Sequence, residues 1–217
     1  PGKAILMVGS GNVGVIVSYQ MLQAGCQVAA VIDAAPEIGG YAVHAAKIAR
    51  TGVPFFMSHT IKEAHGKDRV EGATIIEVDE DWKPIPGTEK QFDVDTVCIA
   101  VGLNPMNQLL RMTGCKLVDS PVLGGKVPSH SLNQETSAKG VYVAGDASGI
   151  EEASTAIIEG RIAGLAIAFR LGYLDEPEFL KQREVQLKSM VGLRSGSHGE
   201  ARGKAKQYLN DTMEAQA

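Results

Sequence analysis

The chain has 217 residues, of which 44% are hydrophobic and 21% are charged, and its formal net charge is −4. This composition is enough for one or two domains with a buried core, and the acidic balance argues against a general nucleic-acid binder. No apolar run is long enough to cross a membrane and no signal peptide is recognisable. We therefore expect a cytoplasmic protein that binds neither nucleic acid nor membrane.

The three cysteines stand alone in the sequence. Cys26, Cys98 and Cys115 lack any C-x-x-C or C-x-C spacing, so we expect no disulfide framework, no redox dithiol and no metal or iron–sulfur site. The chain begins at Pro1 and enters an apolar run within a few residues. We expect it to be part of a longer polypeptide or a processed chain.

The first informative stretch is an apolar run followed by a glycine cluster. Residues 4–8 predict a strand buried on both faces of a parallel sheet. Gly9, Gly11 and Gly14 fit G-x-G-x-x-G, whose glycines allow a tight turn, close approach of a pyrophosphate and close helix–strand packing. A helical pattern begins at Asn12, so the positive end of that helix would face the turn.

A second apolar run, residues 28–32, ends in Asp33. The interval from Gly14 to Asp33 suits an acid that hydrogen-bonds the adenosine ribose of a dinucleotide. An acid there would repel a 2′-phosphate, so the sequence favours NAD over NADP. The alternative is a turn whose glycines serve packing alone, and it leaves Asp33 unexplained.

The next elements complete a mononucleotide-binding pattern and then depart from it. Residues 41–50 predict a helix and residues 53–57 a third parallel strand, which together finish a βαβαβ unit. Residues 69–79 alternate in polarity, and residues 82–94 are rich in turn formers, so we expect an inserted β-meander.

Another buried strand is predicted for residues 95–101 and ends at Gly102. A glycine at the carboxyl end of such a strand permits close approach of a cofactor, although an ordinary turn would use it equally well. Residues 107–112 predict a short helix, and residues 117–127 an irregular segment with short strands.

The second informative stretch spans residues 136–165. We expect a strand over residues 140–144 that runs into Gly145 and Asp146. A helix rich in small residues follows, and their three- and four-residue spacing would let it lie tightly against a sheet. These residues are Ala153, Ala156, Ile157, Gly160, Ala163 and Gly164.

The chain changes character from Tyr173 onward, where lysines and arginines become frequent. Two amphipathic helices are predicted, around residues 178–190 and 201–213. A basic tail of this kind is interpreted as a solvated face rather than a docking surface. Its cations are Lys181, Arg183, Lys188, Arg194, Arg202, Lys204 and Lys206.

With these stretches together, the chain resembles the pyridine nucleotide–disulfide oxidoreductase superfamily, flavoproteins with two dinucleotide-binding domains. The resemblance covers roughly residues 3–168 and rests on three motifs in order: GSGNVG with Asp33, DTVCIAVGLNP and TSAKGVYVAGD. The last resembles the family's second FAD fingerprint. The segment GDASGIEEASTAIIEGRIAGLAIA looks most like the branch with the α subunits of heterotetrameric sarcosine oxidase, dye-linked proline dehydrogenase, opine oxidases and hydrogen cyanide synthase.

The resemblance implies hydride exchange between a nicotinamide and a flavin, with the protein supplying orientation and electrostatics. Gly102 would line the junction between the domains. Asp146, next to Gly145, would accept a hydrogen bond from the flavin ribitol, and Ala153 would lie near the flavin's pyrimidine edge. Asp33 would hold the adenosine ribose. The NAD pyrophosphate would be held by Gly9, Gly11, Asn12, Val13 and Gly14.

The sequence also departs from the family. The first FAD fingerprint is missing, so only the second half of an FAD site is expected, and neither the cysteine pair nor the iron–sulfur segment is present. Glu151 and Glu152 precede the helix expected near the flavin, where ionised acids would oppose negative charge on the reduced ring. We therefore expect both side chains to point to solvent.

The predicted fold class is α/β, with a Rossmann-like three-layer NAD-binding domain and its β-meander insertion (residues 1–106). The C-terminal part of an FAD-binding domain (107–172) and a basic helical tail (173–217) follow. We expect an oxidoreductase part that binds NAD(H), holds FAD weakly or not at all, and is inactive by itself.

The expected partners are a small-molecule substrate or an electron carrier, a flavin-binding half or other subunit, and a second copy of the chain. No residue is predicted to be catalytic, because the five histidines are scattered and flavin hydride transfer needs no such group. The alternatives are a non-catalytic NAD-binding or assembly module, and a dehydrogenase without flavin, which would require a substrate domain that the C-terminal half does not resemble.

Overall fold

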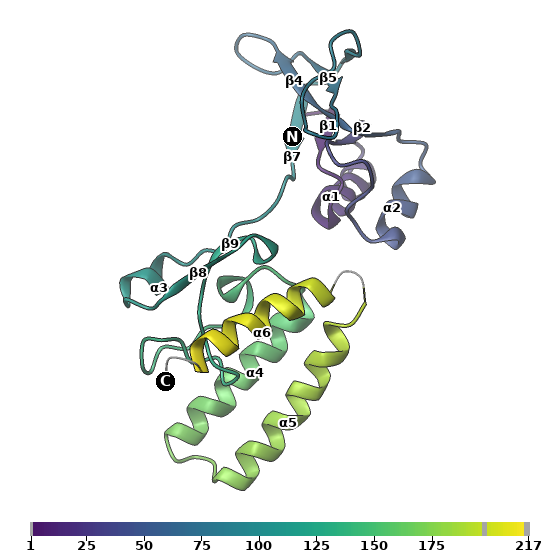
Figure 1. Ribbon diagram of the computed structural model, residues 1–217. Coiled ribbons are helices and arrows are strands. Elements are labelled where there is room, and N and C mark those ends of the chain that lie inside the picture. The colour runs from purple at the N-terminus through teal and green to yellow at the C-terminus, as the bar shows by residue number, and fades with distance from the viewer. Residues whose placement is uncertain (1, 197–198, 215–217) are drawn as a thin grey trace. The chain divides into compact units, whose positions relative to one another are not determined.

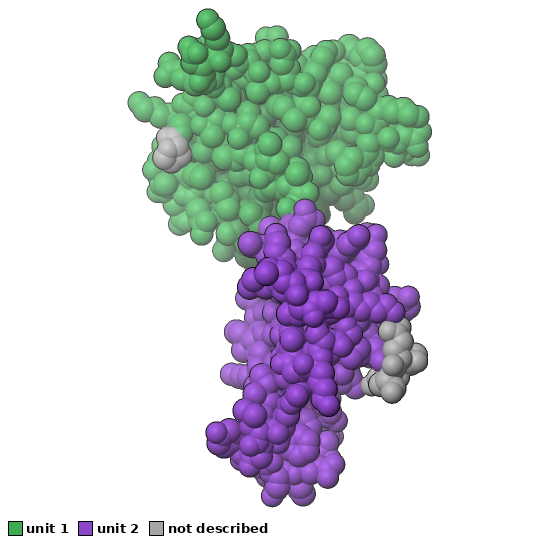
Figure 2. All heavy atoms as spheres, turned by 90° about the vertical axis from the view of Figure 1, so that its left-hand side faces the viewer, with its two compact units in different colours: residues 1–102 green, residues 103–217 purple. Residues whose placement is uncertain are grey.

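The computed structural model describes residues 2–196 and 199–214. The chain divides into two compact units, residues 1–102 and residues 103–217 (Figure 2). The functional division at residue 106 and the separate tail remain predictions.

A parallel sheet of four strands forms the centre of unit 1, in the spatial order β3-β2-β1-β7 (Figure 1). The apolar runs of the sequence supply its two central strands, and the carboxyl ends of β1 and β2 lead into the glycine turn and the loop after Asp33. The strands are β1 (Ala4–Val8), β2 (Gln27–Asp33), β3 (Phe55–Met57) and β7 (Thr96–Ile99).

Two different layers cover this sheet. On one face, Met7 and Val31 pack with Val15 of α1 (Asn12–Gln23) and Ile48 of α2 (Ala42–Ala49). On the other face, Leu6, Val8 and Ile32 pack against the meander residues Ala73 and Ile75. Because side chains alternate across a strand, a continuous apolar run is what a strand covered on both faces requires.

The predicted meander is an antiparallel sheet of three strands, in the order β4-β5-β6. Its first strand was not predicted, since HTIKEAH is mostly polar and belongs to an edge strand with exposed side chains. The strands are β4 (His59–His65), β5 (Gly72–Glu77) and β6 (Lys90–Phe92). The prediction of a buried β7 was also wrong in part, because this edge strand leaves Ile99 68% exposed.

Unit 2 contains a short helix, a two-stranded antiparallel sheet and three longer helices (Figure 1). The first elements are α3 (Gln108–Met112), β8 (Leu117–Ser120), the 3₁₀ turn η1 (Pro121–Leu123) and β9 (Gly125–Pro128). They are followed by the 3₁₀ turn η2 (Gly145–Ser148), α4 (Ala153–Arg170), α5 (Glu176–Leu193) and α6 (Glu200–Glu214). The structure confirms both predicted tail helices. In the described part of the chain, none of the helices is both long and apolar enough to cross a membrane.

Two expectations about unit 2 were wrong. Residues 140–144 form only an isolated bridge, in which Tyr142 pairs with Glu135, because no strand ladder of the described unit lies beside them. The small residues of α4 do not face a sheet either. Added Cβ atoms at Gly160 and Gly164 would meet nothing within 4 Å, while Ile158 and Ile162 on the buried side of α4 pack against Met190 of α5.

Candidate functional site

The three glycines of the turn have different physical roles. Gly9 has φ +108°, and a Cβ there would overlap the carbonyl oxygen of Ala100. A Cβ at Gly14 would overlap the carbonyl oxygen of Gly9, so α1 lies closer to the turn than any side chain permits. Gly11 has no atom within 4 Å of its Cβ position. The backbone at Gly11 is therefore open to a ligand.

The N-terminus of α1 starts at this open position. Gly11 caps the helix without a side-chain hydrogen bond, and the first turn carries no acidic residue. The first N–H groups of a helix have no partner within it and carry the positive end of its dipole. The carboxamide oxygen of Asn12 accepts from the backbone N–H of Tyr41 at 2.8 Å. What Asn12 and Val13 offer an anion here is thus their backbone N–H.

Asp33 ties the end of β2 to the glycine turn. Its Oδ2 accepts from the backbone N–H of Ser10 at 2.6 Å and from Ser10 Oγ at 2.7 Å, and its Oδ1 accepts from the N–H of Ala35 at 3.0 Å. Ser10 Oγ in turn accepts from the N–H of Gly39 at 3.1 Å. A carboxylate can accept about four hydrogen bonds, so Oδ1 keeps the capacity for one more donor.

A cavity of about 510 Å³ lies in unit 1 beside these groups. It brings together Gly9, Gly11, Asp33 and Gly102, which come from the ends of three strands, whereas Asn12, Val13 and Gly14 do not line it. Residues of the meander, Thr60, Val78 and Trp82 among them, complete its wall. Sequence reasoning missed this contribution, and the one available signal was that the chain's single tryptophan stands in a turn-rich segment.

In unit 2, the predicted residues Gly145 and Asp146 lie in η2, and Ala153 begins α4. Gly145 has φ +70°. Its N–H and the hydroxyl of Ser148 both donate to Oε2 of Glu159, each at 2.8 Å. Asp146 and Ala153 are exposed. A buried carboxylate of α4 therefore fixes the turn that presents Asp146.

Glu159 belongs to a buried ionic cluster that the tail helices complete. Lys206 of α6 is 1% exposed and donates to Glu159 Oε1 at 2.8 Å, to Ser148 Oγ at 2.6 Å and to the Ser148 carbonyl oxygen at 3.0 Å. Arg194 donates to Glu159 at 2.9 Å and through two nitrogens to Glu151. Burial lowers the pKa of Lys206. Burial opposes ionisation of Glu159 as well, yet the charge and hydrogen bond of Lys206 hold the Glu159 pKa below its usual value.

The cluster overturns two expectations. Glu151 does not point to solvent, since its side chain is 6% exposed and is bound by Arg194. Glu152 is paired with Arg202 at 3.3 Å. The basic tail is therefore not simply a solvated face, because three of its cations neutralise the acids around η2 and α4.

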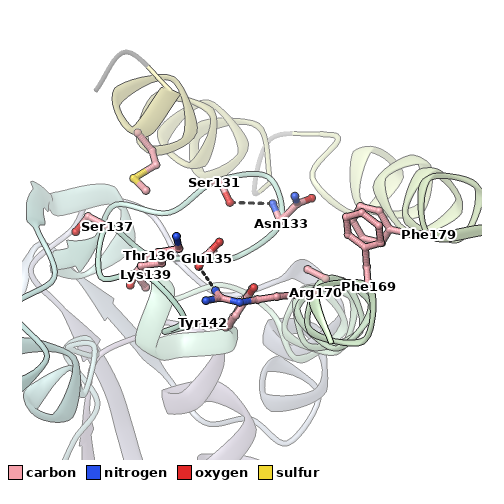
Figure 3. A pocket seen from close by; sticks show the side chains of 12 residues that line it. Ser131, Asn133, Glu135, Thr136, Ser137, Lys139, Tyr142, Phe169, Arg170 and Phe179 are labelled. Atoms are coloured by element: carbon pink, nitrogen blue, oxygen red, sulfur yellow. Dashed lines mark hydrogen bonds and ion pairs between the residues drawn. The ribbon is translucent and has the colours of Figure 1, made fainter. Parts of the chain in front are cut away.

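A second hollow, of about 530 Å³, lies in unit 2 (Figure 3). Arg170 donates to Glu135 at 2.6 Å on one side of it, and the rings of Phe169 and Phe179 stack at 4.7 Å on another (Figure 3). None of the predicted site residues lines this hollow. It has no part in the candidate site.

Known proteins share both the fold and the glycine turn. The family model for pyridine nucleotide-disulphide oxidoreductase matches residues 1–160. The chain belongs to this family. Hydrogen cyanide synthase subunit HcnB of Pseudomonas protegens is 25% identical over 203 residues, which cover 85% of this chain and 42% of that protein. An opine oxidase subunit of Rhizobium meliloti is 28% identical over 190 residues, 79% of this chain and 40% of its own.

Among solved structures, the thioredoxin reductase of T. acidophilum has a TM-score of 0.62 and 27% identity, and the match covers 76% of this chain and 51% of that one. The chain spans less than half the length of the two curated relatives described above. The superfamily and the α/β, Rossmann-like fold predicted from the sequence are thus confirmed.

Replacing Gly14 by alanine should destabilise unit 1 by about 1–3 kcal/mol, because the added methyl group is forced against the backbone of Gly9. Urea unfolding followed by circular dichroism measures this loss. Gly11→Ala is the matched control, since its Cβ meets nothing within 4 Å. Equal stability of Gly14→Ala and the wild type would contradict the close approach.

Replacing Lys206 by methionine should cost about 3–5 kcal/mol of unfolding free energy, because it leaves Glu159 charged, buried and deprived of its closest cation. Lys204→Met on the same helix is the control: Lys204 is 75% exposed and pairs only with surface Glu200, so about 1 kcal/mol or less is expected. Similar urea midpoints for the two variants would show that the cluster does not hold α6.

Acid should destabilise unit 2 before its carboxylates titrate. Burial, followed by the nearby charge of Lys206, lowers the pKa of His130 from 6.5 to about 4. The unfolded chain therefore takes up this proton first, and stability falls as the pH drops from about 6.5 toward 4, by up to about 1.4 kcal/mol per pH unit. Urea unfolding at pH 7 and pH 5 should show a smaller loss for His130→Leu than for the wild type. An equal loss would contradict the assignment.

Proposed function

We propose that this chain is the dinucleotide-binding part of a flavin-dependent NAD(H) oxidoreductase, and that NAD(H) binds in the cavity of unit 1. The observation that carries the proposal is the convergence of Gly11, Asp33 and Gly102 on one cavity. They lie at the carboxyl ends of parallel strands, where open α/β sheets bind their ligands.

The residues present fit a dinucleotide. The open backbone at Gly11 and the N–H groups of Asn12, Val13 and Gly14 would hold the pyrophosphate at the start of α1. The remaining acceptor capacity of Asp33 Oδ1 suits a ribose hydroxyl, and Gly9 keeps the turn tight. The cavity wall carries no lysine or arginine among the described residues. The preference for NAD over NADP follows, because a 2′-phosphate would meet a carboxylate and no cation.

Gly145, Asp146 and Ala153 fit the second half of an FAD site. Asp146 and Ala153 are exposed, and Glu159 fixes the turn between them. The first half would come from elsewhere in the parent protein or from another subunit. The names of the relatives, subunits of hydrogen cyanide synthase and of opine oxidase, support a partner subunit.

When both cofactors are bound, the nicotinamide and the flavin supply the hydride chemistry. The chain's own residues bind the two cofactors and orient them, and no side chain is assigned an acid or base role. The substrate proposed is a small amine or amino-acid-like molecule, or an electron-carrier partner. A second copy of the chain and a cytoplasmic location remain predictions.

The chain should bind NADH at least about tenfold more tightly than NADPH, because the carboxylate of Asp33 repels the 2′-phosphate. Isothermal titration calorimetry of both nucleotides measures the ratio. Asp33→Asn keeps an oxygen acceptor for Ser10 and should reduce the preference, with circular dichroism as the check on folding. Equal affinities for the two nucleotides in the wild type would sink the assignment of Asp33, and absence of NADH binding would leave a non-catalytic assembly module.

A further inference from the structure

Trp82 stands at the tip of the connection between β5 and β6, and its indole is 66% exposed. The carboxylate of Asp79 organises this turn by accepting from the N–H groups of Asp81, at 2.9 Å, and Lys83, at 2.8 Å. Backbone hydrogen bonds from Trp82 to Asp79 and from Asp79 to Lys83 close it. The position of the tryptophan is therefore fixed although its side chain is open to solvent.

The backbone of Trp82 has φ +62°. Bulky residues avoid this left-handed region, and its use away from glycine is concentrated at functional sites. Gly87 in the same connection has φ +88°, so the sequence places glycine where only a turn is needed. Trp82 occupies a strained position with an exposed apolar ring, which folding of unit 1 does not require.

The turn is linked to the loop that follows Asp33. Ser58, with φ +54°, donates its N–H to the carbonyl oxygen of Ala35 at 3.0 Å, and its own carbonyl oxygen accepts from the N–H of Val78 at 2.7 Å. These bonds connect the start of the tryptophan turn to the residues just after β2. Trp82 and Asp33 consequently line one cavity, with Thr60 and Val78 between the turn and the sheet.

We propose that the indole of Trp82 stacks on the adenine ring of the bound dinucleotide. The inference rests on the proposed NAD site, in which Asp33 holds the adenosine ribose, so that the adjoining base lies toward the meander. A purine is flat and uncharged, and an exposed indole offers it an apolar plate. Stacking of a base on an aromatic side chain is worth a factor of roughly 10 to 100 in affinity.

The test uses the fact that Trp82 is the chain's single tryptophan, so its fluorescence reports on this side chain alone. AMP and ADP-ribose should quench the emission of the intact chain, and nicotinamide mononucleotide should not. By calorimetry, Trp82→Ala should weaken ADP-ribose binding by about tenfold or more, and Trp82→Phe should retain most of it. Ile85→Ala is the matched control, since Ile85 lies in the same connection and outside the cavity wall.

The outcomes separate the inference from the function on which it rests. If calorimetry shows NADH and ADP-ribose binding while fluorescence is unchanged and Trp82→Ala binds as the wild type does, the stacking role is wrong and the NAD site stands. If only nicotinamide mononucleotide quenches the emission, Trp82 lies against the other end of the dinucleotide and the inference is overturned. If neither NADH nor ADP-ribose binds, both fail.

Discussion

The structure of unit 1 depends on the close approach of α1 to the glycine turn. Because Gly14 has no side chain, the helix begins against the backbone of Gly9, and its free N–H groups lie at the carboxyl end of the central strand. Asp33 then ties the second strand to the same turn through Ser10. One steric constraint and one carboxylate thus place a positive helix end and a hydrogen-bond acceptor beside the same cavity. This combination is what a dinucleotide with an anionic middle and a hydroxyl-rich ribose needs.

Unit 2 uses charge where unit 1 uses close backbone packing. Glu159 carries the turn of Asp146 on one side and accepts from Lys206 and Arg194 on the other. Buried charges are tolerated only when they are paired and hydrogen-bonded, and here every partner comes from η2 or from the tail helices. The tail is consequently part of the support for the proposed flavin turn, which explains why so many of its cations are not left to solvent.

Local patterns in the sequence were sufficient for β1, the glycine turn, α1, β2 and the tail helices, because each depends on residues close together in the chain. The features that could not be predicted depend on distant partners. Glu151 and Arg194 are 43 positions apart, and no periodicity links them. The polar strand β4 is stabilised by pairing with β5 rather than by its own composition. Trp82 enters the site only because the meander folds back over the sheet face that Leu6 and Ile32 present. A strand was expected at residues 140–144 because its own residues suit one, but a strand also needs a neighbour.

The central claim is that the turn between β1 and α1 binds the pyrophosphate of NAD(H). The most direct measurement is the change in backbone amide resonances of the isotope-labelled chain on addition of NADH. The largest shifts are expected at Gly11, Asn12, Val13 and Gly14, together with Ala35 just after Asp33. Shifts confined to other segments, or no shifts at saturating NADH, would contradict the claim.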